Sequence, residues 1–375
     1  MKQISNSTKR IIVLALAGLL ALLMVVVVVL TSCEKKQSAN QPTDASTEAT
    51  QQIQTEDTQD STGAKDAVSF RHPLTGVPLE QPWSGQLTAV VINNLKKAMP
   101  QRGISKADIF YEVEVEGDIT RCLAVFSDFT DVDVIGPIRS ARTYFSSLAV
   151  SYDAPLVHCG GSPGLALAGR YGASGDTIDN WEHIDQGANG QYFYRDMDRY
   201  SSGYAYEHTL FTTGEKLQKA MEANGYNTPD SKSFGLLFDE GVTLNGQTAN
   251  EVTVKFKGGK TTTFTFDTEK QLYKMYQHGQ DHIDGNTNEV VTFKNVIAIY
   301  TNQTYHSDGY HKFYDTIGSG EGYAAINGQI VPIKWSRESL RTNYTYTLAD
   351  GTPLTLDVGT TYIALVGIKH DIAYK

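Results

Sequence analysis

Two arginines stand close together in the stretch IGPIRSARTY, which covers residues 135–144. Arg139 and Arg142 follow a Gly-Pro turn and precede a segment with helical periodicity. Because a helix N-terminus already carries partial positive charge, structure alone would favour Asp or Glu here. The arginines are therefore either neutralised by carboxylates of the protein or available to an anion, since a guanidinium grips phosphate or carboxylate like a fork.

Other charged residues can complete such a site or cancel its charge. They are Glu112, Glu114, Glu116, Arg121, Arg195 and Asp196. One interpretation is a network of internal ion pairs. The other is that Arg121, Arg139 and Arg142 exceed their local carboxylate partners and hold a ligand.

The turn GGSPG at residues 160–164 matches the pattern of a hydrolase nucleophile elbow, with Ser162 in the nucleophile position. That elbow needs the backbone N–H after the serine, and Pro163 has none. We therefore interpret the match as accidental. Gly160, Gly161 and Ser162 offer amides and a hydroxyl to an anion at a predicted helix start, or they form a simple tight turn; both interpretations stay open.

Several histidines lie near polar residues. His158 ends a predicted buried strand and His208 follows a glutamate; each is a candidate ligand-binding residue or a structural histidine. His278 and His282 lie close to two aspartates, but their spacing fits no strong metal motif. We predict a solvated turn there and no metal site.

A hairpin and a helix must position these side chains. The segments 108–116 and 119–127 alternate like strands around Gly117-Asp118, which favours a two-residue turn. That turn would pair Glu114 with Arg121 and place Arg121 on the same face as the glutamates. The helix is predicted over 140–152, with Ser140 as N-cap.

The wider pattern predicts two folded domains. From 69 to 230, strands and helices alternate, which indicates an α/β or α+β domain with a mixed sheet and flanking helices. From 231 to 375, strand-like segments follow one another between Gly and Asn turns, which indicates a smaller β-rich domain.

The N-terminus predicts export and membrane attachment. Basic residues precede an apolar run over 11–30, and Leu-Thr-Ser-Cys33 follows, like a bacterial lipoprotein signal with its lipidated cysteine. The alternative is a membrane-spanning anchor. The polar segment 34–68 cannot form a core and is predicted to be a disordered tether, with a reach of roughly 30–35 Å. The folded part is expected outside the cytoplasm, on the cell membrane.

Bulk charge and cysteine content limit the choices further. A net charge of −10 argues against nucleic acid as a partner, because phosphate backbones need a basic field. Cys122 and Cys159 could form a disulfide in an exported protein, but two buried thiols are equally consistent with the sequence.

Several motifs together resemble the YerB-like lipoproteins of Gram-positive bacteria, a family of unknown function with an N-terminal and a C-terminal part. The motifs are HPLTG (72–76), YEVEVEG (111–117), ITR (119–121), GPIRSAR (136–142), VHCGGSP (157–163), FYRD (193–196) and EHTLFTT (207–213). The chain departs from the family pattern in two places, with Asn93-Asn94 instead of Asp-Asn and His208-Thr209 instead of His-Asn. Ligand or metal binding at these positions would be altered.

The order of arginine and serine motifs is also similar to that of the LytR–CpsA–Psr enzymes, which transfer lipid-pyrophosphate-linked polymers to peptidoglycan. This resemblance implies that Arg121, Arg139 and Arg142 hold phosphates. It also implies that Glu112 or Glu114 holds a divalent ion as cofactor.

We therefore expect an envelope lipoprotein that binds an anionic glycan, a lipid-linked precursor or a partner protein through an arginine-lined site. The alternatives are a phosphotransferase and a structural member of a cell-wall complex without a small ligand. An arginine without a carboxylate partner would argue against the last.

Overall fold

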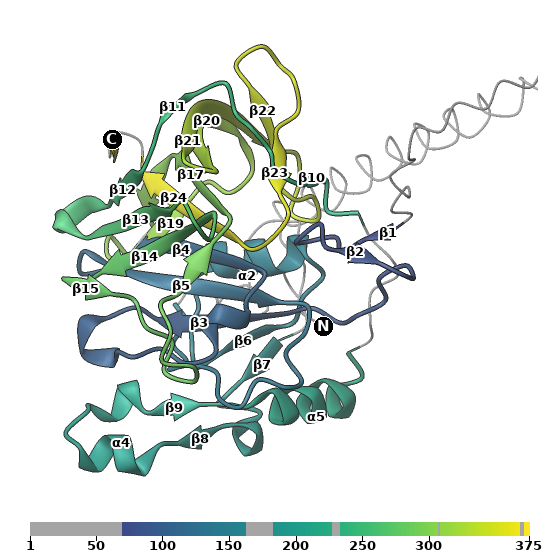
Figure 1. Ribbon diagram of the computed structural model, residues 1–375. Coiled ribbons are helices and arrows are strands. Elements are labelled where there is room, and N and C mark those ends of the chain that lie inside the picture. Colours follow the sequence, from purple (N-terminus) through teal and green to yellow (C-terminus); the bar gives the residue numbers. More distant parts are fainter. Residues whose placement is uncertain (1–69, 163–182, 227–232, 307, 368–370) are drawn as a thin grey trace, which may run out of the picture. The chain divides into compact units, whose positions relative to one another are not determined.

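The computed structural model describes residues 70–162, 183–226, 233–306, 308–367 and 371–375 (Figure 1). All of them fall within one compact unit. The predicted signal segment with Cys33, the tether and the segment after Ser162 lie outside the described residues. No helix in the described ranges is long and apolar enough to cross a membrane.

A mixed eleven-stranded sheet is the largest element of the described part. In spatial order its strands are β11 (Gln247–Thr248), β21 (Gln329–Arg337), β20 (Gly318–Ile326), β17 (Asn295–Thr301), β24 (Thr361–Gly367), β4 (Ile109–Val115), β5 (Ile119–Phe126), β3 (Thr88–Asn93), β6 (Leu156–His158) and β7 (His183–Asp185), with β22 (Thr345–Leu348) beside β21. β24 pairs in parallel with β4. Strands of both predicted domains therefore share one sheet, and the boundary at 230/231 stays a prediction.

Smaller elements surround this sheet. A six-stranded sheet contains β15 (Gln280–Asp281), β14 (Leu272–Gln277), β13 (Thr261–Asp267), β12 (Glu251–Lys255), β25 (Ile372–Tyr374) and β16 (Thr292–Phe293). Paired short strands are β1 (Phe70–Arg71) with β2 (Pro78–Leu79), β8 (Tyr194–Arg195) with β9 (Leu210–Phe211), β10 (Leu237–Asp239) with β23 (Thr355–Asp357), and β18 (Gln303–Tyr305) with β19 (Lys312–Tyr314). The α-helices are α2 (Thr143–Ser151), α4 (Met197–Ser201) and α5 (Gly214–Asn224). The 3-10 helices are η1 (Lys96–Ala98), η2 (Ile104–Lys106), η3 (Gly190–Tyr192), η4 (Tyr206–His208) and η5 (Lys257–Gly259).

Both faces of the central strands are buried. Alternate residues of β4 enter two different apolar clusters: Tyr111 and Val113 face the side that contains α2, whereas Phe110 faces the side of the six-stranded sheet. Period-two alternation explains this division. The mixed sheet with few helices and the β-rich C-terminal part confirm the predicted fold class.

The predicted hairpin register is wrong by one residue. Val115 pairs with Ile119, and Val113 pairs with Arg121. The cause is a three-residue connection, in which Gly117 and Asp118 both have positive φ angles of 75° and 56°. A one-residue slip exchanges the faces of a strand. Arg121 therefore lies on the α2 side, opposite Glu112 and Glu114.

Helix α2 begins later than predicted. Arg142, in an extended conformation, is its N-cap residue, and no side chain caps it. The predicted cap, Ser140, instead offers its carbonyl oxygen to Arg121 at 2.8 Å. This arrangement brings the predicted arginines to one end of α2.

Candidate anion-binding site

Arg121 is the central residue of the arginine cluster. Its residue surface is 6% exposed, and within the described ranges no carboxylate oxygen lies within ion-pair distance of it. Burial and the charges of Arg142 and Arg139 lower the pKa of Arg121 to about 9. The guanidinium is thus protonated at neutral pH, and its charge has no direct partner among these residues. A buried charge is costly unless something compensates it.

The two neighbouring arginines have partners of different quality. Arg142 donates from Nε and Nη2 to the Glu116 carboxylate, with a shortest distance of 2.5 Å, and both side chains are buried. Arg139 lies 3.3 Å from a carboxylate oxygen of Glu207, whose side chain is half-exposed. Three arginines therefore share two carboxylates, and the carboxylate of Glu207 is in contact with solvent. The surplus charge favours an anion.

Three buried polar atoms near the start of α2 have no hydrogen-bond partner among the described residues: Arg139 Nε, Thr143 Oγ1 and Ser162 Oγ. Backbone pairing between Ala141 and Gly161 places the Ser162 segment beside the arginines. Buried polar groups in native proteins are nearly always paired. Thr143 was not predicted as a site residue, although a hydroxyl directly after Arg142 was a usable signal.

Two of the three backbone amides of the glycine turn form hydrogen bonds within the protein. The Gly160 N–H donates to Asp185 at 2.9 Å, and the Ser162 N–H donates to the Ala141 carbonyl oxygen at 3.2 Å. Both amides are therefore occupied by the protein. The Ser162 hydroxyl and the adjoining Gly161 remain as the contribution of this turn.

His158 is buried beside the turn. Its Nδ1 lies 2.9 Å from the Gly160 carbonyl oxygen, and its Nε2 lies 3.2 Å from His183 Nδ1. Since a carbonyl only accepts, His158 donates from Nδ1 to this oxygen. These contacts give it a structural role in shaping the turn.

His208 lies beside the arginine cluster. Asn93 Nδ2 lies 2.9 Å from its Nδ1, so Asn93, which departs from the family pattern, contacts the histidine that keeps it. Burial lowers the pKa of His208; Glu207 opposes this effect, and Arg139 adds to it. A neutral imidazole here adds no further charge to the arginines.

Arg195 and Asp196 have local partners. The Arg195 guanidinium stacks on Tyr206, 4.1 Å from the ring centroid, and donates to its carbonyl oxygen. Asp196 accepts from the Arg199 N–H at the start of α4 and forms an ion pair with Arg102. These contacts explain both side chains without a ligand.

The glutamates predicted to accompany the arginines lie in different surroundings. Glu112 is fully buried on the face under the six-stranded sheet, where Thr120, Thr262 and Tyr362 donate to its carboxylate at 2.6–2.8 Å. Lys260 Nζ lies 3.5 Å away. Burial raises the pKa of Glu112, but Lys260 and the hydroxyl donors outweigh it, so the net pKa is lowered. Glu114 forms a buried ion pair with Lys312.

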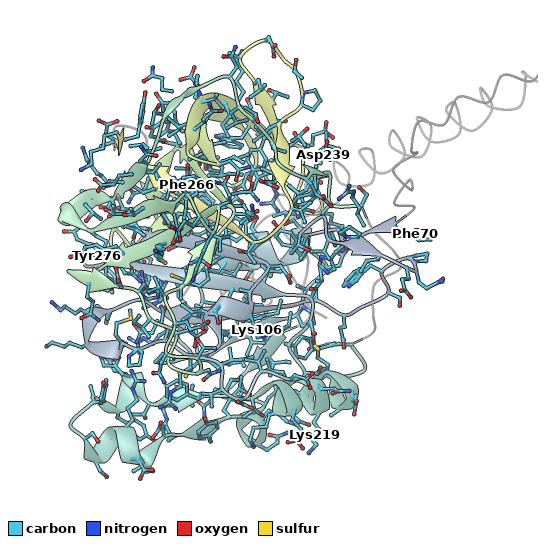
Figure 2. The ribbon with its side chains drawn as sticks, viewed as in Figure 1. Phe70, Lys106, Lys219, Asp239, Phe266 and Tyr276 are labelled. Carbon is cyan, nitrogen blue, oxygen red and sulfur yellow. The ribbon has the colours of Figure 1, made fainter. Side chains whose placement is uncertain are left out.

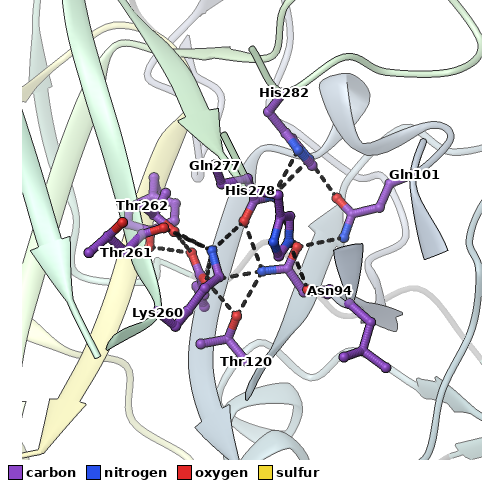
Figure 3. A network of polar contacts seen from close by, with 12 residues as sticks. Asn94, Gln101, Thr120, Lys260, Thr261, Thr262, Gln277, His278 and His282 are labelled. Carbon is purple, nitrogen blue, oxygen red and sulfur yellow. Dashed lines mark hydrogen bonds and ion pairs between the residues drawn. The ribbon is translucent and has the colours of Figure 1, made fainter. Parts of the chain in front are cut away.

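Sequence reasoning missed a buried polar network that includes Asn94, Gln277 and His282 (Figure 3) and that extends to Glu112. Asn94 donates to Glu112 at 3.0 Å and to Gln277 at 3.1 Å, and His282 lies 2.7 Å from Gln101 Oε1. His282 is 3% exposed, so the predicted solvated turn is wrong for this residue. Within the residues that the structure describes, no group of three His, Cys, Asp or Glu side chains is arranged to hold a metal. Cys122 and Cys159 are both free thiols.

Comparisons with known proteins cover both parts of the chain. Two family models match it, described as the N-terminal and C-terminal domains of a protein of unknown function (DUF3048), over residues 74–227 and 252–363. A Bacillus subtilis (strain 168) protein named "Putative lipoprotein YerB" is 30% identical over 315 residues, which cover 80% of this chain and 89% of that protein. The crystal structure of YerB from Bacillus subtilis matches with a TM-score of 0.67 and 27% identity, over 81% of this chain and 99% of that chain.

Proposed function

Because the chain belongs to the DUF3048 family and carries its two domains in order, we propose that it is a lipid-anchored envelope protein that binds an anionic ligand through Arg121, Arg139 and Arg142. The predicted family resemblance is confirmed. The lipoprotein name of the Bacillus subtilis relative supports lipidation at Cys33 and a place on the extracytoplasmic face of the cell membrane.

The observation that carries the binding proposal is the uncompensated charge of Arg121. A structural buried arginine satisfies most of its guanidinium N–H groups within the protein, as Arg142 does with Glu116 and as Arg337 does with five carbonyl and hydroxyl contacts. Among the described residues, Arg121 has only a carbonyl partner, and unpartnered atoms of Thr143 and Ser162 lie on neighbouring segments. Guanidinium groups with nearby hydroxyls match the acceptor oxygens of a phosphate or carboxylate.

The ligand class follows from the envelope setting and the charge. A phosphate group of a wall glycan or of a lipid-linked precursor would satisfy the donors, and a partner protein would need to present a carboxylate in the same place. The phosphotransferase alternative receives less support, because Glu112 is on the opposite sheet face and Glu112 and Glu114 are already paired with Lys260 and Lys312.

Thermal unfolding in the presence of anions tests the proposal. The detergent-solubilised full-length protein is heated with phosphate, pyrophosphate or a polyprenyl pyrophosphate analogue, each with and without Mg²⁺. A ligand that binds the native state raises the melting temperature. We expect the ligand to raise the melting temperature of the wild type but not that of Arg139→Ala. The control variant Arg341→Ala, at an arginine with a 69% exposed side chain, should show the same rise as the wild type. A rise that survives Arg139→Ala would refute the site.

A further inference from the structure

A second recess lies at the start of the folded unit, away from the residues of the arginine cluster. It has a volume of about 620 Å³, and its walls include Phe70, His72, Pro82, Trp83 and Phe238. Figure 2 marks Phe70 at the edge of the described unit. The volume lies within the range of sites that hold small molecules or single residues of a polymer.

The recess is held in shape by tight backbone packing. The His72–Gly76 turn closes with the Gly76 N–H donating to the His72 carbonyl oxygen at 2.8 Å. Gly76 has a φ of 69°, and a Cβ there would lie 2.3 Å from Phe238 Cβ, so only glycine permits this contact. A Cβ on Gly85 would lie 2.7 Å from the Trp83 indole nitrogen. Two glycines thus allow the aromatic walls to lie directly against the backbone.

The walls offer hydrogen-bond donors beside aromatic rings. The Leu74 N–H donates to His72 Nδ1, so the neutral ring carries its proton on Nε2. Burial lowers the pKa of His72 to about 4, which keeps this ring neutral at pH 7. Neither His72 Nε2 nor Trp83 Nε1 has a hydrogen-bond partner among the described residues. The two rings meet edge to face, with centroids 5.6 Å apart.

We propose that this recess binds a neutral pyranose ring of an envelope glycan, an inference that rests on the proposed location in the cell envelope. A sugar ring has apolar C–H faces that pack on Trp83 and Phe70, and its hydroxyl oxygens accept from His72 and Trp83. The described lining contains one cation, Arg71, whose guanidinium donates to the Gly76 carbonyl oxygen at 2.9 Å, and it contains no carboxylate, which disfavours a cationic ligand. A wholly apolar peptide side chain would leave both N–H donors unpaired, which is costly.

Titration calorimetry with a neutral trisaccharide of N-acetylglucosamine tests the proposal on the full-length protein. We expect saturable binding, weakened about tenfold or more in Trp83→Ala, which corresponds to about 1.4 kcal/mol. His72→Asn removes the Nε2 donor but keeps an acceptor for the Leu74 N–H, so it should weaken binding while the melting temperature stays unchanged. Tyr276→Ala is the matched control, because Tyr276 is an exposed aromatic residue at the other side of the view in Figure 2.

Two outcomes would overturn the sugar site. One is an absence of saturable binding up to about 10 mM trisaccharide, beyond the weak affinities typical of single contacts. The other is equal weakening in Trp83→Ala and Tyr276→Ala. Because the probe is uncharged, neither result depends on the arginine site, and Arg139→Ala should leave trisaccharide binding intact.

Discussion

Arg121 is the residue that best separates a binding protein from a purely structural one. A structural arginine stabilises the fold through its partners, whereas a ligand-binding arginine holds a charge that the empty protein must bury at a cost. In this protein, Arg142 belongs to the first kind, because Glu116 engages it bidentately, and we propose that Arg121 belongs to the second.

Arg121→Met should therefore leave the free energy of unfolding unchanged or raise it by about 1 kcal/mol without ligand, because an apolar side chain replaces an unpaired charge. The matched variant Arg142→Met leaves Glu116 buried without its partner and should cost about 3–5 kcal/mol. Urea unfolding of both variants measures the difference. If Arg121→Met destabilises the protein as strongly as Arg142→Met, Arg121 has a structural role and the binding proposal loses its basis.

At the scale of elements, local signals predicted well and non-local pairing did not. The C-terminal end of α5 follows from a local signal, because Gly225 adopts a φ of 68° there, which favours glycine. The register of β4 and β5 was wrong because the connection contains three residues, 116–118, and the Gly117-Asp118 dipeptide alone does not reveal that Glu116 belongs to it. The contacts of Glu112 with Lys260 and Thr262 join segments far apart in the chain, so no local sequence pattern predicts them.

The Glu112 network should be essential for stability, because it joins β4, β13, β14 and β24. Glu112→Gln keeps the shape but leaves Lys260 without its buried counter-charge, and we expect a loss of about 3–5 kcal/mol in the free energy of unfolding. Glu251→Gln is the control, because Glu251 pairs with an exposed Lys375 and should matter little. If the two variants lose the same free energy of unfolding in urea titrations, the buried network does not contribute to stability.

His282 makes this network sensitive to acid. Burial, assisted by the charge of Lys260, lowers the pKa of His282 from 6.5 to about 3. Between these values the unfolded chain binds a proton at His282 and the folded chain does not, so stability falls as pH drops from 6.5 towards 3. His282→Gln should flatten the dependence of the urea midpoint on pH in this window. Parallel profiles for variant and wild type would contradict this assignment.

At the scale of the whole molecule, a net charge of −10 contrasts with the local surplus of arginine charge. Because the overall electrostatic field of the protein repels anions, an anion at the proposed site would be held by direct contacts with the arginines and not attracted from a distance. Proximity to the membrane would compensate for that repulsion by keeping the protein near envelope ligands. Only the sequence and the name of the relative support this membrane attachment, because Cys33 and the tether lie outside the described residues.

Intact mass spectrometry of the membrane-extracted protein tests the anchor. Lipidation predicts a mature chain that begins at Cys33 and carries a diacylglyceryl group, and Cys33→Ser should abolish both the cleavage and the added mass. A full-length chain that begins at Met1 in the wild type would instead establish the membrane-spanning alternative.

Calorimetric titration of pyrophosphate into the full-length protein measures directly whether Arg121 binds an anion. We expect saturable binding in the wild type and in Arg341→Ala, and no saturable heat in Arg121→Met, which the unfolding experiments should show to be folded. Binding of equal strength in Arg121→Met, or no binding of pyrophosphate by the wild type, would contradict the claim that these arginines form an anion site.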